Sequence, residues 1–87
     1  MKKFSYVVVN PMGVHARPAA LLAQLCVGLR SAVTIECNGK TAGGNNVLQV
    51  LALEAKKGDT LNVTVEGVDE EEAVNALVEL VKTGFAD

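Results

Sequence analysis

Alternating apolar and polar residues predict a four-stranded β-sheet. The alternation is clear at residues 32–37 and 61–65, and residues 3–9 are rich in the β-branched and aromatic side chains that favour strands. Asn38-Gly39 is a strong hairpin signal, so a short further strand is predicted from Lys40. Because one side of each alternating strand is polar, one face of the sheet is expected to contact water.

Apolar residues at helical spacing predict helices between the strands. The first is predicted over residues 16–28, with Pro18 in the first turn, where backbone N–H groups have no partner within the helix. A shorter helix is predicted over residues 47–53, and either Asn45 or Asn46 can cap it. The side chains of the first helix expected to face the core are Leu22, Leu25, Cys26 and Leu29.

A third helix is predicted to run to about Thr83. Asp69, followed three residues later by Glu72, resembles a capping box at its start. The acidic residues of the first turn and Lys82 near the end both suit the helix dipole. The acidic run at residues 69–72 is therefore interpreted as capping and solvation and not as an acid–base site.

The predicted element order is β-α-β-β-α-β-α. Three amphipathic helices can cover the apolar face of the sheet, which predicts a two-layer α+β domain with an antiparallel sheet. The chain has 87 residues, so residues 1–87 are expected to form a single domain with one modest aliphatic core.

Charge and aromatic content argue against nucleic-acid binding. The formal net charge is −2, no run of Lys and Arg occurs, and the aromatic residues that stack on bases are scarce. The apolar run at residues 7–9 is too short for a signal peptide or a membrane span. We therefore expect a cytoplasmic protein without direct membrane insertion.

The cysteines give no indication of a metal site. Cys26 and Cys37 do not form a CxxC pair, and the chain has one histidine, so we expect neither a metal nor a cofactor. A disulfide between them is conceivable, but the favoured interpretation is two small buried apolar side chains.

The candidate chemistry lies where the first helix begins. His15 falls at or next to the N-cap, where the backbone N–H groups of Ala16 and Arg17 and the helix dipole form an anion site. The Arg17 guanidinium can bind phosphate through two hydrogen bonds, and neutral imidazole is a competent nucleophile near pH 7. Gly13 allows the preceding loop to bend sharply. The residues alone also permit the simpler interpretation that His15 is an ordinary exposed residue at a helix start.

The segment from Gly13 to Ala19, GVHARPA, resembles the active-site signature of the histidine-containing phosphocarrier protein (HPr) family of the bacterial phosphotransferase system. Residues 45–53 with 57–59, and residues 66–73, resemble the regions of the second and third helices of that family. The resemblance covers essentially the whole chain and implies an open-faced β-sandwich of four antiparallel strands and three helices.

The resemblance also implies a function. The histidine that matches His15 accepts a phosphoryl group on its δ1 nitrogen from phospho-enzyme I, which phosphoenolpyruvate charges, and passes it to an enzyme IIA domain. The residue that matches Arg17 stabilises that group. Such a chain is an intermediate in phosphoryl transfer and not a stand-alone catalyst. Partners are expected to dock on an apolar patch, for which the candidates are Ala20, Val47, Leu48 and Leu51. Packing of these side chains in an ordinary helical core explains some of the positions equally well. Val47 and Leu48 are the favoured exposed members of the patch.

Some positions depart from the family pattern. Many members of the sugar system carry basic residues where this chain has Gln24, Val27 and Gln49. The regulatory serine of many members is replaced by Asn46, so a kinase that phosphorylates that serine is expected to find no acceptor there.

Alternative functions therefore remain open. The Gly84-Phe85 ending and the pairing of Asn45 with Asn46 resemble the nitrogen-related branch of the family, in which the same histidine chemistry feeds a regulatory relay. A hydrolase that passes through phosphohistidine is disfavoured, because no second histidine or general acid accompanies His15. The expected oligomeric state is a monomer.

Overall fold

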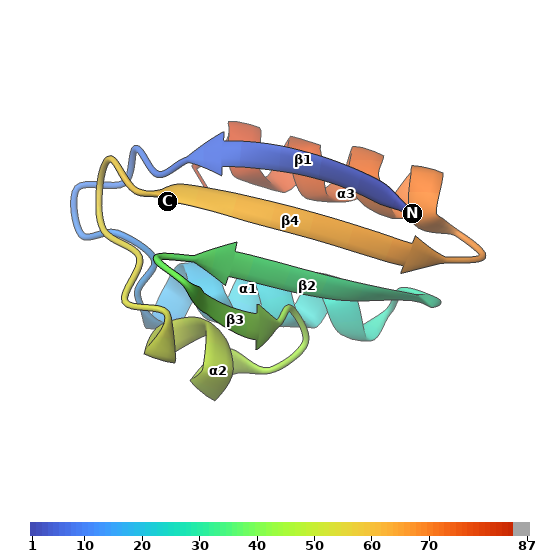
Figure 1. Cartoon of the computed structure of the whole chain (residues 1–87), viewed down its shortest axis with the longest axis horizontal. Helices are drawn as coiled ribbons and strands as arrows, with labels where there is room; N and C mark the ends of the chain where they lie inside the picture. The colour runs from blue at the N-terminus through green and yellow to red at the C-terminus, as the bar shows by residue number, and fades with distance from the viewer. Residues whose placement is uncertain (85–87) are drawn as a thin grey trace.

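The computed structural model describes residues 1–84, which form one sheet and three helices (Figure 1). The elements are β1 (Lys2–Val7), α1 (Ala16–Val27), β2 (Ser31–Cys37), β3 (Lys40–Gly43), α2 (Val47–Ala52), β4 (Thr60–Gly67) and α3 (Glu70–Lys82). This is the predicted β-α-β-β-α-β-α order. None of the helices in this part of the chain is long and apolar enough to cross a membrane.

The strands lie in the order β1-β4-β2-β3, and every neighbouring pair is antiparallel. β4 is therefore inserted between β1 and β2. Figure 1 shows α1 and α3 behind the sheet, with α2 beside α1 under the β3 edge. This arrangement places the start of α1 at the same end of the molecule as the loop between α2 and β4.

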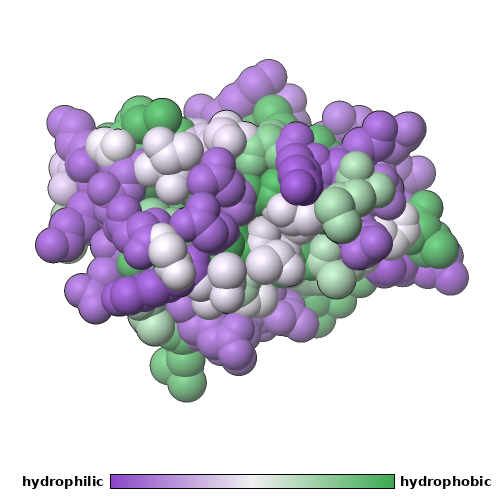
Figure 2. Space-filling view, viewed as in Figure 1, coloured by the Kyte–Doolittle hydropathy of each residue, from purple (hydrophilic) through white to green (hydrophobic). Residues whose placement is uncertain are grey.

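The core lies between the sheet and the helices. Residue pairing places Ile35 of β2 opposite Val63 of β4, and both side chains are buried. The helices complete the core with Leu22 of α1, Val50 of α2 and Leu77 of α3. The predicted alternation of the strands is confirmed, because the other face of the sheet is polar and intermediate in hydropathy (Figure 2).

The first strand is shorter than the predicted span of residues 3–9. Its pairing with β4 ends at Val7 opposite Thr60, where β4 begins. Val8 instead bonds to the loop before β4: its N–H donates to the Asp59 carbonyl, and its carbonyl accepts from the Gly58 N–H. The apolar pattern continued past the point at which a partner strand is available.

Both cysteines are free and buried. Burial raises the pKa of the Cys26 thiol to about 11, and burial, followed by the charges of Asp59 and Glu36, raises the pKa of Cys37. Because the thiolate is the reactive form, both thiols behave as the small apolar side chains that the sequence favoured.

The predicted capping box at the start of α3 is wrong. Asp69 occupies the N-cap position, but its side chain makes no capping hydrogen bond. The carboxylate accepts hydrogen bonds from the Arg30 backbone N–H at 2.9 Å and from the Ser31 hydroxyl. Asp69 therefore ties the start of α3 to the turn between α1 and β2, and these distant donors replace the local ones.

These bonds predict a pH dependence of stability. Hydrogen bonds from the Ser31 hydroxyl and then the Arg30 N–H lower the pKa of Asp69 from its ordinary value of 3.8. A carboxylate whose pKa is lower in the folded state stabilises the fold above its unfolded-state pKa, and that contribution is lost as the pH falls through the folded-state value. We expect Asp69→Asn to be less stable than the parent chain in urea denaturation at pH 7. The difference should shrink below about pH 3.8; a gap of constant size would contradict this role.

Candidate functional site

His15 is the N-cap residue of α1, as the sequence predicts. Its backbone is extended, and its side chain makes no capping hydrogen bond. Its carbonyl oxygen accepts a hydrogen bond from the Ala19 N–H, with an N···O distance of 3.0 Å. The next two N–H groups, of Ala16 and Arg17, have no protein acceptor within residues 1–84, and Pro18 has no N–H to offer. The start of α1 therefore has two adjacent backbone donors that are available to an anion beside the imidazole.

Gly13 shapes the loop that leads to His15. Its φ of +70° lies in the left-handed region, and a Cβ atom at this position would lie 2.3 Å from the Ala55 carbonyl oxygen. The loop is held there because the Val14 N–H donates to the same carbonyl at 3.0 Å. Glycine thus permits both the turn and the close approach that bring His15 to the start of α1.

We expect Gly13→Ala to destabilise the fold by about 2–4 kcal/mol, the combined cost of a left-handed backbone and a steric clash. Urea denaturation measures the loss. The matched control is Gly39→Ala, because Gly39 has a φ of +80° but nothing within 4 Å of the added Cβ. That variant should lose only about 1 kcal/mol. Equal losses in the two variants would show that the contact with Ala55 is unimportant.

Asn10, which the sequence predicts only as part of a turn, supports the loop that leads to His15. Its side chain is 4% exposed, and its Nδ2 donates to the Gly84 carbonyl at 2.7 Å. The loop before His15 is therefore anchored to the residues that follow α3. The NPMG turn pattern indicates a bend, but no local signal indicates a partner 74 positions away.

Arg17 supplies the positive charge of the site. Its side chain is exposed and forms no ion pair with any residue from 1 to 84. The guanidinium is permanently charged, so it is available to a phosphoryl group at the start of α1.

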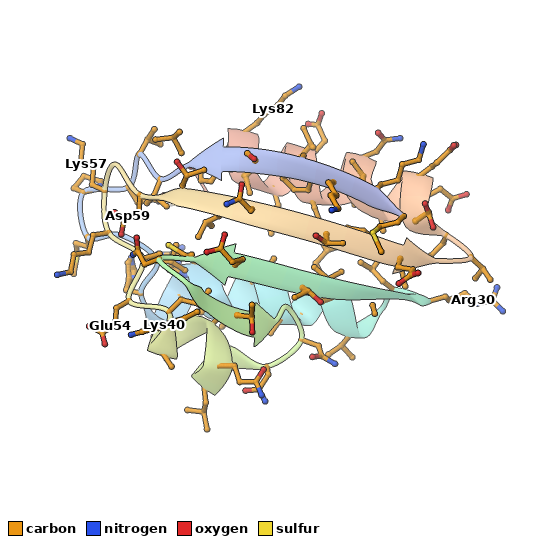
Figure 3. The ribbon with its side chains drawn as sticks, viewed as in Figure 1. Arg30, Lys40, Glu54, Lys57, Asp59 and Lys82 are labelled. Carbon is orange, nitrogen blue, oxygen red and sulfur yellow. The ribbon has the colours of Figure 1, made fainter. Side chains whose placement is uncertain are left out.

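Lys57 extends outward at one end of the molecule, where Asp59 and Glu54 also lie (Figure 3).

The four predicted docking residues lie on two helices that pack against each other, Ala20 on α1 and the others on α2. Ala20 is exposed, and Leu48 is 79% exposed. Val47 and Leu51 are only partly buried but pack against the core, so Val47 is less available than the sequence analysis expected.

Asn46, and not Asn45, is the N-cap of α2. Its side-chain oxygen accepts the Gln49 N–H at 3.1 Å. The Gln49 side chain in turn accepts the Gly43 N–H at 2.8 Å, which joins α2 to β3. The absent serine hydroxyl therefore does not cost the helix its cap.

Of the C-terminal pair that resembles the nitrogen-related branch, Phe85 lies outside the described residues.

Comparison with known proteins identifies the family. The family model described as "PTS HPr component phosphorylation site" matches residues 2–83. The chain belongs to the HPr family. It is 36% identical over 81 residues to phosphocarrier protein HPr of Lysinibacillus sphaericus, a match that covers 93% of this chain and 92% of the relative. The fold agrees with this assignment: the HPr-C-His structure from Thermoanaerobacter tengcongensis superimposes with a TM-score of 0.92 at 33% identity, covering 100% of this chain and 98% of that one.

HPr-like sequences also occur within longer relatives. The chain is 37% identical over 82 residues to the phosphoryl donor subunit DhaM of a PEP-dependent dihydroxyacetone kinase from Providencia stuartii. That match covers 94% of this chain and 17% of DhaM. The chain therefore corresponds to a small part of that protein and to nearly all of the short phosphocarriers.

Proposed function

We propose that this chain is the phosphocarrier of a phosphoenolpyruvate-dependent sugar phosphotransferase system, with His15 as the phosphoryl acceptor. The observation that carries the proposal is the position of His15 at the N-cap of α1, beside the N–H groups of Ala16 and Arg17. The family model, described as a phosphorylation site, spans this segment. Phospho-enzyme I is the proposed donor, an enzyme IIA domain is the proposed acceptor, and both steps take place in the cytoplasm.

The acceptor atom that best fits this position is Nδ1. Nδ1 is bonded directly to Cγ. The side-chain oxygen of an Asn or Asp at an N-cap is also bonded to Cγ, and it accepts hydrogen bonds from N–H groups of the first helical turn. A phosphoryl group on Nδ1 therefore extends its oxygens toward the Ala16 and Arg17 N–H groups. The Nδ1 lone pair forms the new N–P bond while the bond between phosphorus and the donor protein breaks, and the bonding pair stays on the donor group. The phosphorylated His15 ring then gives up its Nε2 proton, and the donor group takes up one proton, so that charge balances. No water is consumed, and the reverse geometry serves onward transfer.

The residues beside His15 favour transfer over hydrolysis. The phosphoryl oxygens carry negative charge throughout an in-line transfer, and the Arg17 guanidinium and the helix start stabilise it. No second histidine accompanies His15 to activate water as a general base, and no evident general acid is placed to assist the leaving imidazole. The phosphorylated chain is therefore proposed to persist until a partner removes the group, and the chain acts as a monomeric carrier.

The decisive experiment is incubation of the chain with enzyme I and phosphoenolpyruvate, followed by intact mass measurement. We expect the mass to rise by that of one phosphoryl group, and we expect the bond to be labile in acid and stable in alkali, as a phosphoramidate is. Release of inorganic phosphate without accumulation of the phosphorylated chain would instead indicate a hydrolase. No modification at all would refute the proposal.

The similarity to DhaM favours a second acceptor class, a dihydroxyacetone kinase. The regulatory module of the nitrogen-related branch is a third assignment that uses the same site chemistry. The purified phosphorylated chain can be offered in parallel to an enzyme IIA domain of the sugar system, to its counterpart in the nitrogen-related branch and to a dihydroxyacetone kinase. Fastest loss of the phosphoryl group to the sugar-system domain supports the first assignment, and fastest loss to another acceptor replaces it.

A further inference from the structure

The loop that leads to His15 packs against the peptide group between Ala55 and Lys56. The carbonyl oxygen of this group accepts a hydrogen bond from the Val14 N–H, with an N···O distance of 3.0 Å. Apart from the adjoining residues, the three atoms nearest to a Cβ added at Gly13 all belong to this peptide group, at 2.3 to 3.2 Å. Val14 directly precedes His15, so the peptide group sets the position of the chain where it enters the site.

The opposite side of this peptide group is held by the Asp59 carboxylate. The Lys56 N–H donates to Asp59 Oδ2, with an N···O distance of 2.9 Å. The same oxygen accepts a hydrogen bond from the Asn38 side-chain amide at 3.0 Å, which attaches it to the turn between β2 and β3. A trans peptide group is planar, and its N–H and C=O point in opposite directions, so the bond on the N–H side also orients the carbonyl. Asp59 therefore orients the Ala55 carbonyl that accepts the Val14 N–H.

The turn that contains Asp59 also holds the first residue of the loop. The Asp59 N–H donates to the Lys56 carbonyl at 2.9 Å, which closes the turn. Val8, directly after β1, accepts a hydrogen bond from the Gly58 N–H at 2.8 Å and donates one to the Asp59 carbonyl at 2.9 Å. Both ends of the loop before His15 are therefore bonded to the same short segment between α2 and β4.

We infer, on the basis of the proposed function, that Asp59 is a positioning residue for phosphoryl transfer to His15. It acts through the peptide group between Ala55 and Lys56 and through Val14, and not on the phosphoryl group itself. The negative carboxylate polarises the peptide group, which strengthens the hydrogen bond that its carbonyl accepts. In-line transfer requires the acceptor nitrogen to stay aligned with the donor, so a loosened loop slows the transfer step.

The first test measures the hydrogen bond of Val14 directly. Exchange of the Val14 amide hydrogen with solvent, followed by NMR, should be about fivefold faster in Asp59→Ala, because the Lys56 N–H has lost its acceptor and the peptide group can turn. Asp59→Asn retains an oxygen that can accept the same N–H, so its exchange rate should stay within about twofold of the parent value. Unchanged exchange in Asp59→Ala would overturn the inference, whatever the transfer rates.

The matched control is Asp69→Ala. The Asp69 carboxylate also accepts one backbone N–H and one side-chain donor, from Arg30 and Ser31. Arg30 lies at the opposite end of the molecule from Asp59 (Figure 3). The two variants therefore lose the same kinds of hydrogen bond, but only Asp59→Ala should change the exchange of the Val14 amide.

The second test measures phosphoryl transfer from the phospho-enzyme I of the same organism. Rapid-quench measurement over a range of chain concentrations separates the maximal rate of a single transfer from the concentration that gives half of that rate. Asp59→Ala should lower the maximal rate about fivefold and change the half-saturating concentration less than about twofold, because the acceptor moves while the contact surface does not. Asp59→Asn should restore the rate to within about twofold of the parent. Asp69→Ala should transfer at the parent rate, and an equal loss in both alanine variants would refute the inference.

A further variant separates the two bonds of the Asp59 carboxylate. Asn38→Gly removes the side-chain donor but suits the backbone, since Asn38 has a φ of +54°. Asp59 keeps its bond to the Lys56 N–H, so Val14 exchange and phosphoryl transfer should both match the parent chain. A loss equal to that of Asp59→Ala would assign the effect to the attachment at the turn between β2 and β3, and would overturn the inference.

The two levels of the proposal fail in different ways. If enzyme I does not phosphorylate the parent chain, the proposed function is refuted and the role of Asp59 in transfer with it. If the parent chain is phosphorylated on His15 but Asp59→Ala transfers at the parent rate, the positioning role alone is refuted.

Discussion

We expect that replacing His15 with alanine abolishes phosphorylation of the chain by enzyme I and phosphoenolpyruvate. His15 is the one imidazole in the sequence, and it lies at the N-cap of α1 beside the two available N–H groups. The variant keeps the N–H groups and Arg17 but has no nitrogen to form the N–P bond. The expected result is no gain in mass under conditions in which the parent chain is fully converted.

The variant should fold normally. The His15 side chain is only partly buried in the loop at the start of α1, so its loss should change the free energy of unfolding by less than about 1 kcal/mol. A thermal melt and the far-ultraviolet circular dichroism spectrum provide the control. His15→Gln, which retains a polar side chain of similar size, should be equally inactive. Undiminished labelling of either variant would move the acceptor to another residue and refute the assigned site.

The second large effect is expected from Arg17. We predict that Arg17→Ala slows phosphoryl transfer by about tenfold or more, because the phosphoryl oxygens lose a guanidinium partner when the N–P bonds are partly formed. Arg17→Lys should recover part of the rate, since lysine keeps the charge but not the two parallel hydrogen bonds. Rapid-quench measurement of a single transfer from phospho-enzyme I gives these rates directly.

Stability measurements distinguish a role in transfer from a role in folding. Arg17 is exposed and has no ion-pair partner within residues 1–84, so Arg17→Ala should change the free energy of unfolding by less than about 0.5 kcal/mol. Arg30→Ala is the matched control, because Arg30 is also exposed but lies at the far end of the molecule (Figure 3). That variant should transfer at the parent rate. Equal rates for the two alanine variants would exclude a specific role for Arg17.

The arrangement of His15, Arg17 and the first-turn N–H groups at the start of α1 could be predicted because these groups are close together in the sequence. His15 and Arg17 are two positions apart, and the first turn of a helix always leaves N–H groups without partners within the helix. For the same reason, the sequence predicts that the N-cap of α2 is either Asn45 or Asn46. Helix N-termini and hairpins depend on short-range geometry, so the residues that form them are neighbours in the sequence.

The errors arose where distant groups competed with local ones. Asp69 and Glu72 had the spacing of a capping box, but the Asp69 carboxylate binds the Arg30 N–H and the Ser31 hydroxyl across the fold. The apolar run at residues 3–9 continued beyond the last residue that β4 can pair with. In both places the local pattern was compatible with the prediction, and a tertiary contact determined the outcome.

The sequence by itself determined the element types, the polar outer face of the sheet and the position of His15 at the start of a helix, because side-chain alternation, helix spacing and helix termini depend on residues a few positions apart. Only the tertiary structure decided that β4 lies between β1 and β2, and that the His15 loop is held by Ala55 and, through Asn10, by Gly84. These contacts join residues some 40 to 74 positions apart, and their partners are chosen by how the helices and the sheet pack together and not by any pattern along the chain.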